Sequence, residues 1–147
     1  MVGIWRFTIR DAVTGRIKRV QTYRNLLPTV GRAAIANHLT SATPSPAALR
    51  INKTALGTGV TAPANGDTQL QTETFRKDTA SATNSNNVGF VTAFYTAPEV
   101  SGTFREAGLF INGTATVNSG TLFSRVAINI TKTASETLTI DYTLTIS

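Results

Sequence analysis

The last segment of the chain contains the pattern that most restricts the fold. Apolar side chains there alternate with threonine and aspartate, and the apolar positions are Leu138, Ile140, Tyr142, Leu144 and Ile146. Side chains of a β-strand point alternately to opposite faces, so this period of two predicts a strand with one apolar and one polar face. A shift of one residue would bury the polar face, and we therefore expect its register to be firmly set.

The same alternation begins the chain, where Trp5, Phe7 and Ile9 are separated by polar residues. The turn-rich residues 11–15 lead into a second apolar-polar segment over residues 16–23, which predicts an N-terminal hairpin. Asn112-Gly113 is a strong turn signal between two later strands. Further strand-like segments cover residues 49–57, 73–79, 88–96, 103–111 and 121–130.

Threonine is the most frequent residue type in the chain, and it is β-branched, which suits pleated strands with a solvated face. Seven or eight short strands separated by turns predict a mainly β fold, either an antiparallel β-sandwich or a small barrel. The predicted division is a basic N-terminal hairpin that serves as a docking segment, residues 1–24, and a single β-rich domain, residues 25–147.

A few segments do not have the strand pattern. The alanine-rich residues 29–39 predict one short helix with Thr29 as its N-cap. Asp67 is expected to cap a single helical turn. We expect residues 41–48 and 81–87 to form loops. Gly57 and Gly59 lie in a tight loop and not in a phosphate-binding loop, because no Gly-Lys-Ser/Thr follows them.

Charge is concentrated at the start of the chain. The net charge is +6, and residues 1–32 carry seven cations against Asp11, whereas the other residues sum to zero. Such a segment could dock on an acidic partner protein, bind nucleic acid, or simply form the solvent face of a hairpin. We expect no nucleic-acid partner, because the segment lacks a recognition helix and an aromatic series. The candidate partner-docking residues are Trp5, Arg6, Arg10, Arg16, Lys18, Arg19 and Arg24.

The sequence offers no constellation for chemistry. It has no cysteine and one histidine, His38, and its eight acidic residues are scattered. We therefore expect no catalytic, cofactor-binding or metal-binding residues and no cofactor. Glu106 lies beside an apolar segment, so it should be buried and compensated by an arginine such as Arg76 or Arg125. The candidate structural ion pair comprises Arg105, Glu106 and Arg125.

Four segments, in this order, resemble a family of small bacteriophage virion proteins that are often encoded among tail genes. The first segment precedes the predicted helix, and the second contains Gly57, Gly59 and Arg76. The third surrounds Glu106, and the fourth contains Arg125. Their ranges are 25–32, then 55–63 continuing to 67–73 and Arg76, then 105–110, and lastly 119–125 with 131–134. The resemblance spans residues from about 25 to 147. The resemblance implies a non-enzymatic structural protein that forms homo-oligomers, as trimers or rings.

The resemblance favours a tail-associated component of a fibre, tip or baseplate, with other virion proteins as partners. The first alternative is a capsid decoration protein, and a further one is a receptor- or carbohydrate-binding module with Trp5 or Tyr95 as its aromatic residue. The first residues lack the apolar core of a signal peptide, and no apolar run is long enough to span a bilayer. We therefore expect synthesis in the host cytoplasm, no membrane partner, and the virion as final location.

Overall fold

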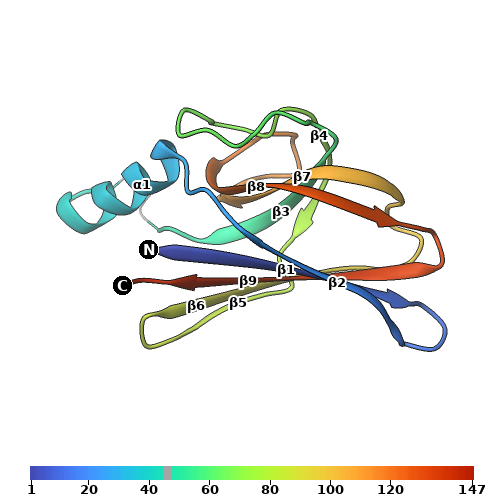
Figure 1. Cartoon of the computed structure of the whole chain (residues 1–147). Coiled ribbons are helices and arrows are strands. Elements are labelled where there is room, and N and C mark those ends of the chain that lie inside the picture. The colour runs from blue at the N-terminus through green and yellow to red at the C-terminus, as the bar shows by residue number, and fades with distance from the viewer. Residues whose placement is uncertain (45–47) are drawn as a thin grey trace.

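The computed structural model describes residues 1–44 and 48–147, and in them two antiparallel sheets pack face to face (Figure 1). The first, sheet A, has the order β2-β1-β9-β6-β5, and the second, sheet B, has the order β4-β3-β7-β8. The fold is therefore mainly β and sandwich-like, and of the two predicted architectures the closed barrel is wrong. Sheet A consists of β1 (Val2–Asp11), β2 (Ile17–Arg24), β5 (Ser81–Ser85), β6 (Val88–Tyr95) and β9 (Glu136–Thr145). Sheet B consists of β3 (Ile51–Gly57), β4 (Glu73–Asp78), β7 (Gly102–Ile111) and β8 (Thr121–Lys132).

The strands with clear alternation build the core. Trp5, Phe7 and Ile9 of β1 and Leu138 and Ile140 of β9 are almost fully buried between the sheets. Aromatic rings pack edge-on or stacked in the same core, with Trp5 next to both Phe7 and the ring of Tyr142. The predicted N-terminal hairpin is confirmed as β1 and β2, which pair antiparallel.

β1 is an interior strand of sheet A and not part of a separate segment. It pairs with β2 on one side and, along its whole length, with β9 on the other. The hairpin of residues 1–24 therefore shares its core and one sheet with the remainder of the chain. A boundary at residue 24 does not separate two packing units.

The only helix among the described residues, α1 (Thr29–Thr40), packs against β8. It extends one residue beyond the predicted end. Thr29 is its first residue and not its N-cap; that position belongs to Pro28, whose carbonyl accepts the first backbone bonds of the helix. Pro28 cannot cap through its side chain, so the start of α1 is defined by its extended backbone.

Two further local predictions are wrong. Residues 81–85 form the exposed strand β5 and not a loop, and they pair with β6 through a connection at Asn86, which has a φ of 51°. The segment at Asp67 is irregular, because its carboxylate accepts the Ala64 N–H and not bonds of a helical turn. β7 and β8 pair antiparallel, and residues 112–120, which begin with the Asn112-Gly113 turn signal, connect them. Of the predicted loop at residues 41–48, residues 45–47 lie outside the described part of the chain.

Candidate functional site

The outer face of sheet A is a strand surface that no other described element covers (Figure 1). In Figure 1, sheet B and α1 lie on one side of sheet A, and the described residues leave its other side open. We call this surface the docking face. Its side chains point outward from four strands and include Ile4, Arg6, Arg10, Val20, Thr22, Arg24, Phe90, Thr92, Phe94, Thr139, Asp141 and Thr143. Thr8 also points to this side, but its neighbours leave it only 4% exposed.

The pairing register explains why these residues share one face. Trp5, Phe7 and Ile9 point into the core, so their neighbours Arg6 and Arg10 point outward. Residues directly opposite each other in an antiparallel pair lie on the same face. The resulting rows run across β2, β1, β9 and β6: Thr22–Arg6–Asp141–Thr92 and Arg24–Ile4–Thr143–Phe90.

Cationic and aromatic side chains remain available on this face. Phe90 and Phe94 are both 42% exposed. Arg6 and Arg24 are exposed, Arg10 is half-buried, and the ion pairs of the described residues include none of these three arginines. Phenylalanine and arginine are enriched in the centres of protein interfaces, so the composition of the face suits protein binding.

A groove on the docking face is lined by residues of β1, β2, β6 and β9. Its volume is about 320 Å³, and Ile4, Arg6, Phe90 and Asp141 are among its lining residues. The Thr92 hydroxyl donates a hydrogen bond of 3.0 Å to the Asp141 carboxylate, which orients that carboxylate along the sheet. A partner side chain entering this groove would contact one aromatic ring and one guanidinium.

Trp5 is not part of the docking face, which corrects the sequence-based prediction. Its side chain is fully buried, and its Nε1–H donates a 3.0 Å hydrogen bond to the Ser124 Oγ of the opposite sheet. Tyr95 is also fully buried, and its hydroxyl is directed at the Thr54 carbonyl. Neither aromatic residue that the carbohydrate-binding alternative relied on is exposed.

Two of the predicted docking cations are used within the fold. Lys18 and Arg19 each lie 3.3 Å from the buried carboxylate of Glu136, and Arg19 also donates to the Thr131 carbonyl. These contacts fasten the β1–β2 hairpin to the turn before β9. Arg16, in the hairpin turn, is exposed. The structure thus brings together Arg6, Arg10 and Arg24 on one face and directs Lys18 and Arg19 elsewhere.

The Glu136 contacts predict a pH-dependent contribution to stability. A hydrogen bond from the Thr133 N–H, assisted by Lys18, lowers the pKa of Glu136 below its ordinary value of 4.5. A lowered folded-state pKa means that this contribution to stability is complete above pH 4.5 and disappears as the pH falls through the folded pKa.

We expect Glu136→Gln to reduce the free energy of unfolding by about 1–2 kcal/mol at neutral pH, and by much less in acid. Urea titrations at pH 7 and about pH 2 test this; equal differences at both values would contradict it.

Glu106 is buried at the centre of a polar cluster in sheet B. Its carboxylate is 1% exposed and accepts hydrogen bonds from the backbone N–H groups of Gly59, Gln71 and Thr72. Arg125 donates two further bonds to it, of 3.1 and 2.9 Å. The charge is therefore compensated by five donors, which is what a carboxylate inside a protein requires.

Arg125 links Glu106 to the loop between β3 and β4. Its guanidinium also lies 2.6 Å from the Asp67 carboxylate and donates to the Thr61 carbonyl. A side chain added at Gly59 would collide with the Glu106 carboxylate, which explains the glycine of this loop. Arg105, which the sequence grouped with this pair, is exposed, and the ion pairs of the described residues do not include it.

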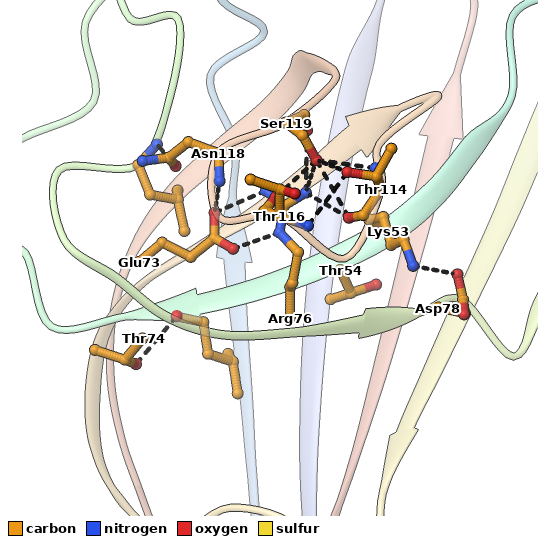
Figure 2. Close-up of polar contacts among 12 residues, drawn as sticks. Lys53, Thr54, Glu73, Thr74, Arg76, Asp78, Thr114, Thr116, Asn118 and Ser119 are labelled. Carbon is orange, nitrogen blue, oxygen red and sulfur yellow. Dashed lines mark hydrogen bonds and ion pairs between the residues drawn. The ribbon is translucent and has the colours of Figure 1, made fainter.

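Arg76, the other arginine proposed for Glu106, forms a second buried cluster with Glu73 (Figure 2). Its guanidinium lies 4.5 Å from the centre of the Phe110 ring and donates to the Ser119 hydroxyl at 2.9 Å. The Glu73 carboxylate in turn accepts the Asn118 N–H. This second cluster holds the loop between β7 and β8, and sequence reasoning missed it because pairing at this spacing is not expected on a strand.

The Glu106–Arg125 cluster holds the loop between β3 and β4, and the Glu73–Arg76 cluster holds the loop between β7 and β8. Each buried carboxylate accepts hydrogen bonds both from an arginine on a strand and from backbone N–H groups of a loop. Across residues 1–44 and 48–147, no group of three or more histidine, cysteine and acidic side chains is arranged to hold a metal ion. Nor does the described part of the chain contain a helix long and apolar enough to cross a membrane.

Comparisons with known proteins gave no relative: no protein-family model, no curated protein and no solved structure matches this chain.

Proposed function

We propose that this chain is a non-enzymatic structural protein of a bacteriophage virion that assembles by protein–protein contacts through its docking face. The observation that supports assembly is the open face of sheet A, where Arg6, Arg24, Phe90 and Phe94 lie on paired strands of one rigid sheet. Asp141 is the only acidic residue of this face as defined above, so the face is basic and suits an acidic neighbour.

The phage part of the proposal is supported by the four-segment resemblance. In the structure these segments meet: Leu26 exchanges two backbone hydrogen bonds with Arg125, and Arg125 contacts Glu106 and Asp67. Glu73, Arg76 and Ser119 form the neighbouring cluster. The shared residues therefore belong to one packed unit around sheet B, which is typical of a common scaffold.

The docking face lies outside the four resembling segments. Arg6, Arg10 and Arg24 precede them, and Phe90 and Phe94 fall between the second and third. We infer that the family shares a scaffold while each member carries its own binding face. A tail-associated position is our first proposal and capsid decoration the second, because a flat basic face against an acidic neighbour serves both.

Charge reversal tests the proposal directly. We expect Arg6→Glu with Arg24→Glu to reduce incorporation into particles at least about tenfold, because reversed charges would face an acidic partner. The measurement is quantitative mass spectrometry of particles purified from cells that express the variant. The matched control is Arg16→Glu with Arg105→Glu, two exposed arginines outside the docking face, and it should incorporate normally.

Two results would contradict the proposal. If both double variants incorporate like the unchanged chain, the docking face is not the contact. If the unchanged chain is absent from the particles, it is not a virion protein.

A further inference from the structure

The outer edge of sheet A at β5 differs from the other strand edges of the molecule. All five residues of β5 are exposed, and their sequence, Ser-Ala-Thr-Asn-Ser, contains no charge and no proline. β5 pairs with β6 in one continuous register without a bulge. Proteins usually protect exposed edges with lysine, proline or bulges, and β5 has none of these.

The other edge strands are protected. β2 contains Lys18, Arg19 and Arg24, so two copies would repel each other there. β4 has four charged residues among its six, and its pairing with β3 is interrupted by a register shift. β8 is bridged by Leu26 and covered by α1. Among the described residues, β5 is thus the one of the four sheet edges whose backbone groups remain open to another strand.

We propose that β5 is a homotypic interface, at which two copies of this chain pair their β5 strands antiparallel about a two-fold axis. A two-fold axis makes the pairing reciprocal: if one residue of β5 lies opposite a second residue in the other copy, that second residue lies opposite the first. The absence of charge on β5 removes the like-charge repulsion that such pairing would otherwise create. Sheet A of one copy and sheet A of the other would then form one continuous sheet, joined by main-chain hydrogen bonds between the two β5 strands.

A groove beside β5 supports the same occupant. Its volume is about 540 Å³, and Leu49, Ile51, Ala82 and Leu144 are among its lining residues. These side chains are only partly buried or exposed within one copy. A second copy at the β5 edge would shelter this apolar lining, which adds hydrophobic burial to the main-chain hydrogen bonds.

The pairing would double the docking face. Outward residues of β5 continue the rows of that face, since Thr83 is opposite Phe90 and Ser81 is opposite Thr92. In the dimer, two sets of Phe90 and Phe94 would flank the two-fold axis, with the arginines of β1 and β2 farther out. The inference extends the proposed function but does not depend on it, because dimerisation is measured on the isolated chain.

Complementary charges at the centre of β5 provide the test. Sedimentation equilibrium of the unchanged chain should give twice 15.6 kDa at high concentration and dissociation on dilution. Thr83→Glu and Thr83→Lys should each be monomeric, since like charges then oppose each other, and an equimolar mixture of the two should recover the dimer. Thr68→Glu, at an exposed threonine in the loop between β3 and β4 and outside sheet A, is the matched control and should dimerise normally.

Hydrogen exchange of the unchanged chain is the second readout, and the β5 amides should become protected as concentration rises. The proposal is overturned if the unchanged chain is monomeric at up to about 1 mM, the weakest affinity that would matter in solution. A trimer or ring, a dimer that Thr83→Glu leaves intact, or no β5 protection in the dimer would also overturn it. Failed particle incorporation with an intact β5 dimer would count against the proposed function alone.

Discussion

Deleting residues 1–24 should abolish cooperative folding of the whole chain. The deletion removes β2 and β1, so that β9 loses the strand it pairs with along its whole length, and it removes Trp5, Phe7 and Ile9, which are at most 2% exposed. Loss of a single buried Trp or Phe side chain typically costs about 3–5 kcal/mol, and a whole domain is stable by only about 5–15 kcal/mol. The truncated chain should therefore show no cooperative transition in urea.

Single substitutions separate this core role from a docking role. We expect Trp5→Ala to reduce the free energy of unfolding by about 3–5 kcal/mol, because it leaves a cavity and removes the bond to Ser124. Val13→Ala, at a hairpin-turn position that is 93% exposed, is the control and should change stability by less than about 0.5 kcal/mol. A truncated chain that still unfolds cooperatively, as an independent docking segment would allow, would refute this assignment of β1.

Replacing Arg125 by methionine should reduce the free energy of unfolding by about 3–5 kcal/mol. The substitution leaves the Glu106 carboxylate buried with three backbone donors and no compensating cation. It also releases Asp67 and the Thr61 carbonyl, so the loop between β3 and β4 should become more open to exchange. Urea unfolding measures the stability loss, and amide hydrogen exchange over residues 58–72 measures the loosening.

Arg105→Met is the matched control for the Arg125 experiment. Arg105 is an exposed arginine adjacent to Glu106 in sequence, and its replacement should alter stability by less than about 0.5 kcal/mol. Equal losses for the two variants would mean that the buried ion pair is not what holds the loop.

The parts of the fold that the sequence predicts well are strands with one buried face. β1 and β9 alternate cleanly because one side of each strand contacts the core and the other side contacts solvent. β5 was missed for the opposite reason. All five of its residues are exposed, so neither face selects apolar side chains, and the sequence carries no period of two.

Long-range polar contacts are the parts that periodicity does not reveal. Glu106 was correctly expected to need a cation, but Arg125 and the loop donors around it are brought near only by the pairing of β7 with β8 and β3. No periodic pattern in the sequence predicts the ion pair between Glu73 and Arg76. Its geometry depends on Ser119 and Asn118, which come from a loop far along the chain.

The candidate docking residues are separated by the parity of their positions along each strand. The alternation that places Trp5 with Phe7 and Ile9 also places it opposite Arg6 and Arg10, so one strand face cannot contain both groups. The same reasoning applied to β6 separates Phe90 and Phe94 from the buried Val91, Ala93 and Tyr95. The net charge identifies residues 1–32 as basic. Whether a residue is at an odd or an even position along its strand determines whether its side chain points outward, where a partner protein could contact it.

A cryo-electron microscopy map of particles from cells that carry the gene tests the central claim most directly. Our account predicts that this chain occupies a defined position in the particle and that Arg6, Arg24, Phe90 and Phe94 contact an acidic neighbouring protein. A map that contains the chain with its docking face open to solvent, or particles from which the chain is absent, would contradict the account.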